Sequence, residues 1–440
     1  MAMVVKNNMS AISTLNTLNK NSSALAKSLQ KVSSGMKING AADDASGYAI
    51  SERMRVQIRG LDQANSNTQN GSSMMKVAEG AVSSTVDILK TLKEKVINAA
   101  NDTNTDSDRQ TIQKELNQSI DQINDNANVT FNGKYLVDGS HNKKIQQTST
   151  TLTNQSLSTG TAAASALTGL ADRNGNNLNI HVKDNITVSY VKQGKTYTTT
   201  FEVKSDTKLS DIVDNANKVR VAGGSGDLKI SQVSSAIGKD SSGNTVYTAD
   251  GTSAISISAG KSGVSEQISG LTISVTDSDG NINKSANAVL DNFNESIRAE
   301  NGGPDNSLVL QVGTKANQAI KVGLSDMRSE ALGLSGSDGS KLNISTQVKA
   351  NAAINVLDNA VQKALDQQTT IGSIESRLEY TSSNLTTASE NVQAAESTIR
   401  DADMAKEMTN YTKNNVLLQA AQSMLAQANQ SSSSVLSLLQ

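Results

Sequence analysis

The sequence predicts a mainly α-helical protein, in which both chain ends form a long antiparallel coiled-coil scaffold with β-hairpins and an α+β, β-rich outer domain is inserted between them. Three observations carry this prediction. Apolar residues recur every three or four positions near both ends. The middle of the chain is rich in Ser, Thr, Gly, Asn and Asp. Only 2% of the 440 residues are aromatic, which suits helix seams and thin sheets better than a large compact core.

The N-terminal region is expected to be helical over residues 1–130. From Met75 to Ala99 its apolar positions step alternately by three and four, which is the spacing of a heptad seam. This seam includes Leu89, Leu92 and Val96. A polar break follows at 104–106, after which Asp106 or Ser107 is expected to cap a second helix. Phe131-Asn132-Gly133-Lys134 is expected to end that helix in a turn.

The C-terminal region, residues 343–438, shows the same period. One helix is expected over residues 343–397, and it would be about 80 Å long at 1.5 Å per residue. Its apolar positions again step by four and three. The two helical regions are therefore expected to pack against each other as a scaffold, and the C-terminal seam includes Leu378, Leu385, Val392 and Ile399.

The extreme ends carry apolar stripes on short, polar-rich sequence. Isolated helices of this kind are only marginally stable in water. The stripes must therefore pair with each other or with other copies of the chain, which makes them the expected assembly interface. Its members are Met9, Ile12, Leu15, Leu18, Leu25, Leu29, Val32, Met404, Met408, Leu417, Leu418, Met424, Leu425, Val435, Leu436 and Leu439.

The middle block, residues 140–300, is expected to form one small α+β module. Apolar and polar residues alternate over 186–190 and again over 197–201, on either side of Gln193-Gly194, which predicts a β-hairpin. The other elements expected here are a helix at 206–219, strands at 227–233, 253–258 and 271–276, and a helix at 285–299. The Ser/Thr runs at 148–163 and 252–262 are expected to be solvated loops.

The composition argues against catalytic chemistry. The chain has no Cys, two His and a formal net charge of −2, which leaves little for thiolate chemistry, a multi-His metal site or nucleic-acid binding. Gly260-Lys261-Ser262 lacks the first glycine of a phosphate-binding loop, and Asp277–Asn281 is not followed by the glycine and glutamate of a calcium loop. Asp43-Asp44 is expected to cap a helix or lie in an interface. We predict no enzyme activity, cofactor or metal.

Several segments of the chain resemble the bacterial flagellin family. The most diagnostic is Ala41–Ile50, with the sequence AADDASGYAI. The resemblance covers about residues 1–140 and 307–440, and residues 141–306 carry none of it. Its other segments are Asn7–Ala11, Leu29–Asn39, Ile58–Leu61, Phe131–Gly133, Leu310–Gly313, Ala316–Gln318, Ile399–Ala405, Leu425–Gln430 and Val435–Leu439.

The resemblance implies a structural subunit that assembles head-to-tail into the helical flagellar filament used for motility. Residues 1–43 and 398–440 would form a terminal core domain that lines the filament lumen and is disordered in the monomer. Residues 44–140 and 307–397 would form the helical scaffold, and residues 141–306 a variable surface domain. The protein would be extracellular, secreted by type III export without a cleaved Sec signal. No run approaches the ~20 apolar residues that span a bilayer.

The resemblance also implies partners. These are other flagellin subunits, an export chaperone at the C-terminal segment, and the filament cap and hook–filament junction proteins, with no nucleic acid and no membrane insertion. A Toll-like receptor of the host is a further partner, and the family's receptor motif aligns with 90–97 and Glu115. Thr91 and Lys95 replace the Arg and Leu of strongly recognised flagellins, so weak recognition is expected. The expected receptor surface is Thr91, Glu94, Lys95 and Glu115.

Three alternatives stay open at this point. A hook–filament junction protein shares the same terminal pattern and is the main one. A flagellin that carries a hydrolase in its insert is disfavoured because the insert lacks metal ligands. An outer domain that binds a ligand, as in an adhesin, is disfavoured because the insert has few aromatic residues.

Overall fold

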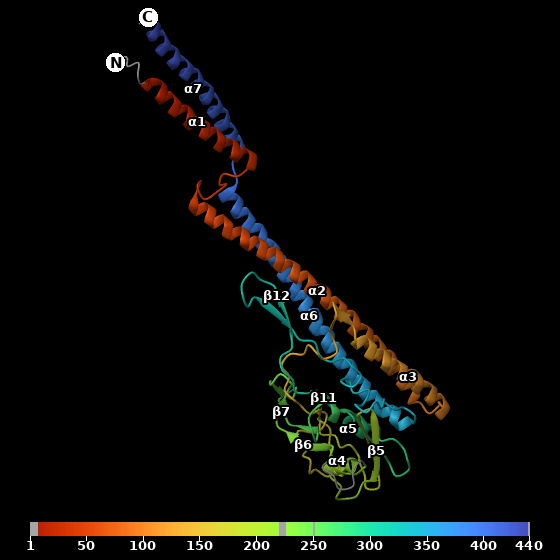
Figure 1. Ribbon diagram of the computed structural model, residues 1–440. Helices are drawn as coiled ribbons and strands as arrows, with labels where there is room; N and C mark the ends of the chain where they lie inside the picture. Colours follow the sequence, from red (N-terminus) through yellow and green to blue (C-terminus); the bar gives the residue numbers. More distant parts are fainter. Residues whose placement is uncertain (1–7, 220–225, 250, 439–440) are drawn as a thin grey trace. The chain divides into compact units, whose positions relative to one another are not determined.

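About half of the chain is helical in the computed structural model, which describes residues 8–219, 226–249 and 251–438 (Figure 1). The chain divides into two compact units. The first contains the chain up to Thr68, the short segment Gln311–Gln318 and the chain from Tyr380 onward, and the second contains the rest. The helices α2 (Ala45–Ala99) and α6 (Gln347–Arg400) run through both units. Within the described residues, no helix combines the length and hydropathy needed to cross a membrane.

In the first unit, α1 (Met9–Ser34) and α7 (Met404–Leu438) lie side by side and antiparallel (Figure 1). The side chain of Asn8 accepts a hydrogen bond from the N–H of Ala11 and caps the start of α1, and Gly35 ends the helix with φ 70°. The parts of α2 and α6 that belong to this unit meet through a small apolar cluster. It is formed by Leu61, Ala64 and Leu385, with Ala388 and Val392 packed against it.

The helical part of the second unit contains the expected N-terminal seam. Leu89, Leu92 and Val96 are at most 2% exposed. The next helix, α3 (Asp106–Ala127), follows the same pattern. It buries Leu116, Ile120 and Ile123 completely, and these apolar positions again step by three and four. In α6, Leu378 is buried as expected, and further along, in the first unit, Leu385 is buried while Val392 and Ile399 are half-buried.

The residue that caps α3 differs from the expected one. Thr105, rather than Asp106 or Ser107, precedes the helix, and its hydroxyl accepts a hydrogen bond from the N–H of Asp108. The Asp108 carboxylate accepts one from the N–H of Thr105 in return. This reciprocal capping box satisfies two backbone donors at once, which a cap one residue later would not do.

Short hairpins follow the scaffold helices. β1 (Thr130–Phe131) and β2 (Lys134–Tyr135) are joined by Asn132 at φ 50° and Gly133 at φ 75°, so the turn expected after the second helix is confirmed. β12 (Leu308–Gln311) and β13 (Ala319–Val322) form a second hairpin. Its tip lies against α2 in the first unit, because a Cβ added at Gly60 would lie 2.9 Å from Thr314 Cγ2.

The outer module is built from two antiparallel sheets. One has the strand order β10-β4-β5 and the other β11-β3-β9-β6, and a two-stranded ribbon β7-β8 lies beside them. The expected hairpin is confirmed, since β4 and β5 pair from Asn185↔Glu202 to Lys192↔Lys195 around Gln193-Gly194. The strand bounds are β3 (Thr151–Asn154), β4 (Asn185–Lys192), β5 (Lys195–Glu202), β6 (Leu228–Val233), β7 (Ala236–Lys239), β8 (Thr245–Tyr247), β9 (Ala254–Ala259), β10 (Ile268–Thr276) and β11 (Asn294–Ile297).

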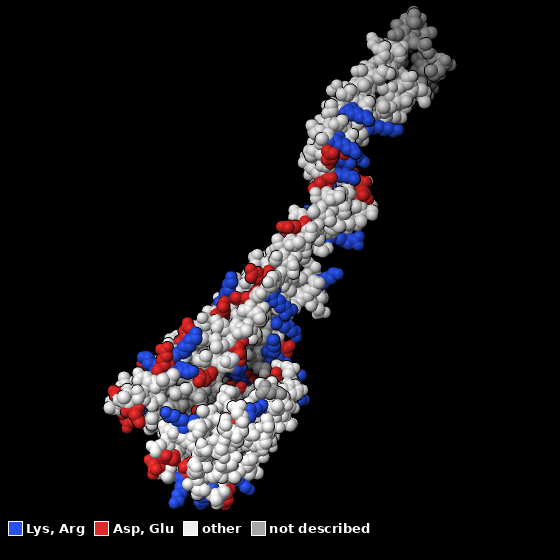
Figure 2. All heavy atoms as spheres, turned by 180° about the vertical axis from the view of Figure 1, so that it is seen from behind, with Lys and Arg blue, Asp and Glu red and all other residues white. Residues whose placement is uncertain are grey.

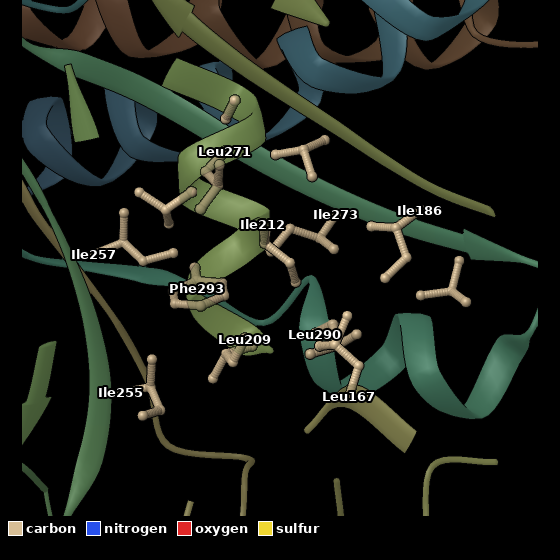
Figure 3. Close-up of a cluster of buried hydrophobic side chains, with 14 of the residues drawn as sticks. Leu167, Ile186, Leu209, Ile212, Ile255, Ile257, Leu271, Ile273, Leu290 and Phe293 are labelled. Atoms are coloured by element: carbon tan, nitrogen blue, oxygen red, sulfur yellow. The ribbon is translucent and has the colours of Figure 1, made fainter. Parts of the chain in front are cut away.

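The core of the outer module lies between these sheets and two helices (Figure 3). The helix expected at 206–219 is present as α4 (Leu209–Lys218), and its apolar face is buried. The second is α5 (Lys284–Leu290). Two short 3₁₀ turns, η1 (Leu167–Gly169) and η2 (Val264–Glu266), complete the module. Figure 3 shows aliphatic side chains converging from all these layers, among them Leu167, Ile186, Leu209, Ile212, Ile257, Ile273 and Leu290.

Three expectations for this module are wrong. The run at 252–262 is not a solvated loop, since it contains β9, which is buried at five of its six positions. The helix expected over 285–299 ends at Leu290, because the Asp291 carboxylate accepts a hydrogen bond from the N–H of Ile273 and the chain then pairs with β3 as β11. The run at 148–163 is not a solvated loop, since it contains the fully buried β3. The buried Asn154 is hydrogen-bonded within the module, since its Nδ2 donates to the carbonyl of Val289 at 2.6 Å.

The outer module is attached to α6 within the second unit. Asn355 Nδ2 donates to the carbonyl of Leu271 and Asn359 Nδ2 to that of Ser269, both at 2.9 Å. A Cβ added at Gly270 would lie 2.7 Å from Val356 Cγ2, so the glycine is what allows β10 to approach the helix. These contacts seat the three-stranded sheet directly on α6.

A carboxyl group buried in β11 predicts a pH dependence of stability. Burial raises the pKa of Glu295 to about 7. The positive charges of Arg298 and Lys363 lower this pKa, and the negative charge of Glu300 raises it. Because the raised pKa means that the folded state holds the proton more tightly, this stabilisation is complete below pH ~4.5 and is lost as the pH rises to ~7. We expect the loss to be on the order of 3 kcal/mol. Asp291, whose pKa burial raises to about 6, acts in the same direction.

The measurement is the free energy of unfolding by urea at several pH values between 4.5 and 8. Glu295→Gln should flatten the pH dependence, because the amide cannot ionise. The exposed Glu202 provides the control, and Glu202→Gln should keep the wild-type profile. An unchanged profile in Glu295→Gln would contradict the assignment.

Candidate assembly interface

Two of the terminal motifs meet at Arg400, the last residue of α6. Arg400 Nη1 donates to Glu52 Oε1 at 2.7 Å, and its guanidinium lies 5.7 Å from the ring centre of Tyr48. The hydrogen bond from Arg400 lowers the pKa of Glu52 more than any other contact does. The backbone continues the joint, because Lys37 N–H donates to the Arg400 carbonyl at 2.7 Å. The segments at 41–50 and 399–405 are thus parts of one structural joint.

Asp44 has the capping role expected for the Asp43-Asp44 pair. Its Oδ1 accepts hydrogen bonds from the N–H groups of Ser46 and Gly47, both at 3.0 Å, in the first turn of α2. Asp43 Oδ2 accepts one from the N–H of Asn39 at 3.1 Å. Both carboxylates therefore fix the turn that leads from α1 into α2.

The seam between α1 and α7 is partly polar. Its members on α1 are the less exposed positions, which step by three and four from Ala11 through Leu18 and Leu25 to Val32. Polar residues fill alternate seam positions and hydrogen-bond across it: Asn21 Nδ2 donates to the Leu417 carbonyl at 3.2 Å, and Asn414 Nδ2 to Ser28 Oγ at 3.0 Å. A seam with so few large apolar side chains contributes little burial.

Many of the larger apolar side chains of this antiparallel helix pair face away from the seam. Met9 is 69% exposed and Met424 63%. An isolated pair of helices gains nothing from such residues, whereas covering one large apolar side chain contributes about 1.5–3 kcal/mol. The others on this outer face are Ile12, Leu15, Leu29, Met404, Met408, Val416 and Leu417, all of them more than 40% exposed. We call this set the outer apolar face.

The same pair of helices has no charged residues over the half that contains the start of α1 and the end of α7. Residues 8–19 and 414–438 contain no Lys, Arg, Asp or Glu. Figure 2 shows this stretch as a white end on the face that it displays. An exposed apolar face with no flanking charge is a surface made for contact with other protein rather than with water.

The structure separates the residues of the predicted assembly interface into two groups. Met9, Ile12, Leu15, Leu29, Met404, Met408, Leu417 and Met424 are exposed on the outer apolar face, whereas Leu18, Leu25, Val32, Leu418 and Leu425 are half-buried in the seam. Val435 and Leu436 lie in α7, but their side chains are outside the described set, and Leu439 is outside the described residues.

The apolar pattern of the sequence does not indicate the polar members of the seam or the joint at Arg400. A period search limited to apolar residues cannot register a seam that contains Asn21, Ser28 and Asn414. Counting Asn, Ser and Thr at heptad spacing would have found it, as the same steps continue through them.

The residues aligned with the receptor motif lie on the surface of the second unit. Thr91 and Glu94 are exposed on α2. Lys95 and Glu115 form an ion pair across α2 and α3, with Lys95 Nζ 3.0 Å from Glu115 Oε1. The aligned lysine therefore engages the aligned glutamate, and each reduces the charge that the other presents to solvent.

Comparison with known proteins identifies both terminal regions. Residues 5–142 match the bacterial flagellin N-terminal helical region and residues 354–439 the bacterial flagellin C-terminal helical region. The chain is 34% identical over 431 residues to a flagellin of Clostridium tyrobutyricum, covering 97% of this chain and 99% of the relative. It is 30% identical over 458 residues to a flagellin of Bacillus subtilis (strain 168), covering 99% of this chain and 100% of the relative.

Among solved structures, a flagellar hook associated protein-3 from Legionella pneumophila is similar at 14% identity and a TM-score of 0.33, over 78% of this chain and 97% of that one.

Proposed function

Because the chain belongs to the bacterial flagellin family and is a structural subunit of the flagellar filament, we propose that it polymerises through the outer apolar face of the paired helices α1 and α7. The observation that supports this most strongly is the exposure of Met9, Met424 and the rest of the outer apolar face on helices whose residues 8–19 and 414–438 carry no charge. Subunits that use such a face head-to-tail build an open helix rather than a closed ring.

The terminal pair is proposed to become ordered on assembly. Its polar seam gives α1 and α7 little stability as an isolated pair, so packing against neighbouring subunits would supply the remaining burial. On this proposal residues 1–43 and 398–440 form the lumen-lining core, 44–140 and 307–397 the scaffold, and 141–306 the surface domain. We propose that the protein has no catalytic activity, because its family is a structural one.

Electron cryomicroscopy of filaments grown from the purified chain tests the proposal. Met9, Ile12, Leu417 and Met424 should be buried between subunits, and helices α1 and α7 should lie innermost. Filaments that leave these side chains in solvent would contradict it. A hook–filament junction protein is less favoured, since the chain matches flagellins over nearly its whole length.

Removal of the outer module should leave assembly intact. Ile145 and Gly303 are paired in a β-bridge, so the chain enters and leaves the module at one point and a short Gly-Ser linker can replace residues 146–302. We expect such a variant to form filaments visible by negative-stain electron microscopy, with some loss of thermal stability because α6 loses the contacts at Val356. Failure to polymerise, with the helices still folded by circular dichroism, would assign the module a part in assembly.

Recognition by the host receptor is proposed to be weak. Thr91 offers no guanidinium fork, and Lys95 is engaged by Glu115 instead of providing an apolar anchor. The double variant Thr91→Arg/Lys95→Leu is expected to bind the receptor ectodomain at least about tenfold more tightly, since restoring one hot spot contributes ~1.4 kcal/mol or more. Surface plasmon resonance measures this, with Thr91→Ser as control. Equal affinity of the double variant and the wild type would refute the proposal.

The remaining partners follow from the same exposed surface. We propose that an export chaperone covers the apolar residues of α7, and that the filament cap and the junction proteins contact the same terminal domains. Location in the flagellar filament follows from the family. Export without a cleaved signal is part of the proposal.

A further inference from the structure

A buried ion triad links the two sheets of the outer module. Lys192, the last residue of β4, places its Nζ 2.8 Å from Asp227 Oδ1 and in still closer contact with Glu266 Oε2. The side chains are 3%, 13% and 26% exposed in that order. Removing an ammonium this completely from water is unfavourable, and the ion pairs offset that cost only in part. The triad therefore holds a buried ammonium between two carboxyl groups.

Asp227 is held in place through both its backbone and its carboxyl group. The N–H of Gly260 donates to the Asp227 carbonyl at 2.7 Å, and a Cβ at position 260 would overlap the carbonyl oxygen of Gly226. The hydroxyl of the fully buried Tyr190 donates to Asp227 Oδ2 at 3.4 Å, and its ring stacks on Tyr197 with 5.2 Å between centroids. Asp227 thus presents one oxygen to Tyr190 and the other to Lys192.

The other two members of the triad also stand on fixed backbone. Lys192 is paired on both sides in its sheet, with Lys195 on β5 and with Ile268 on β10. Glu266 closes the η2 turn, in which its N–H donates to the carbonyl of Gly263 at 3.0 Å. The end of β4, the residue just before β6 and the η2 turn therefore bring an amine, a carboxyl and a second carboxyl together.

We propose that Lys192 and Asp227 condense after folding into an intramolecular isopeptide bond, with Glu266 as the proton shuttle. Nζ of Lys192 attacks Cγ of Asp227, so that an N–C bond forms and one C–O bond of the carboxyl group breaks. Glu266 accepts protons from the amine and delivers them to the departing oxygen. In total, one ammonium and one carboxylate give one neutral amide and one water, and nothing is oxidised or reduced.

Proximity and burial both favour this reaction. Cγ is one bond away from the oxygen that Nζ contacts, and fixed neighbours of this kind reach effective concentrations of about 10⁵–10⁸ M. The product is neutral, so the reaction also removes two charges from a site that solvates them poorly. Hydrolysis is disfavoured where water is excluded. The bond would join β4 to the start of β6, a separation of 35 residues, in a chain that has no Cys for disulfides.

Ordinary Lys–Asp pairs in the same chain lack these features. Lys321 Nζ lies 3.0 Å from Asp305 Oδ2, at about the same separation, but the two side chains are 63% and 40% exposed. Water competes at such a site and leaves the ion pair as the stable form. The Lys321–Asp305 pair is therefore the matched control.

Mass spectrometry of the full-length folded protein tests the proposal. The intact mass should be lower than the sequence mass by one water, and this difference should survive denaturation in urea. Trypsin does not cleave after a Lys acylated on Nζ, so the digest should contain a branched peptide in which residues 184–195 are joined to residues 221–229. A sequence mass without loss of water would overturn the proposal. So would a loss of water confined to a linear peptide, since that is a succinimide.

Variants separate the roles of the three residues. Lys192→Arg and Asp227→Ala should show the sequence mass and no branched peptide, whereas Asp305→Ala should keep the branched peptide at the wild-type yield. Glu266→Gln should lower the yield of the branched peptide at least tenfold, in protein whose circular dichroism matches the wild type. A branched peptide at full yield in Glu266→Gln would remove Glu266 from the mechanism, and its presence in Lys192→Arg would refute the site.

Discussion

Deletion of residues 404–440 is expected to leave a folded protein that forms no filaments. The deletion removes α7 and with it Met404, Met408, Leu417 and Met424 of the outer apolar face. It also leaves α1 without the helix against which Leu18 and Leu25 pack, so that α1 is no longer stable as a helix. Both halves of the proposed contact surface are therefore lost through one change.

The rest of the chain should survive this deletion. Arg400 and its contacts with Glu52 and Tyr48 lie before the cut, and the second unit has a core of its own. We expect circular dichroism to show a loss of helix equivalent to α1 and α7 and an unchanged thermal transition for the remainder. Electron microscopy and sedimentation detect polymer. Filaments from the truncated protein would show that assembly does not require α7.

The scaffold could be predicted from the sequence because its physics is local and repetitive. Leu89, Leu92, Val96 and Leu378 are buried as their heptad spacing requires, since a single stripe per helix determines which face turns inward. The β4–β5 hairpin could be predicted for a similar reason, because Gln193-Gly194 supplies the two positive φ angles that a tight turn needs.

The outer module was harder to predict because its decisive contacts are distant in sequence. Nothing in 285–299 indicates that the chain after Leu290 pairs with β3, more than a hundred residues earlier. The threonines of β3 are buried, because β-branched side chains suit a strand that is covered on both faces. Composition alone cannot distinguish a buried threonine from an exposed one.

The sequence predicts that the candidate site exists, but not which of its residues form the seam and which form the outer apolar face. The apolar stripes at both ends indicate that a contact surface exists, yet they do not tell which residues pair within the chain and which face outward. That distinction depends on the polar seam through Asn21, Ser28 and Asn414, which the pattern of apolar residues alone does not indicate. The residues that stay exposed are the ones for which substitution should affect assembly and spare the monomer.

A charge placed on the outer apolar face provides the sharpest test of that distinction. Met424 is 63% exposed, so Met424→Lys should not destabilise the monomer, and lysine is as good a helix former as methionine. Between subunits, however, the ammonium would have to be buried where residues 414–438 offer no carboxylate to pair with it. We expect the critical concentration for polymerisation to rise about a hundredfold, which corresponds to ~2.7 kcal/mol per subunit.

Two control variants make this result specific to the proposed interface. Met424→Leu keeps the face apolar and should polymerise at close to the wild-type concentration. Val182→Lys adds the same charge to an apolar residue that is 51% exposed on the outer module, and it should also leave the critical concentration unchanged. Sedimentation over a range of protein concentrations gives the value for each variant. Equal critical concentrations for Met424→Lys and Val182→Lys would mean that the filament leaves this part of α7 in solvent, because a lysine that keeps its water has no reason to oppose assembly.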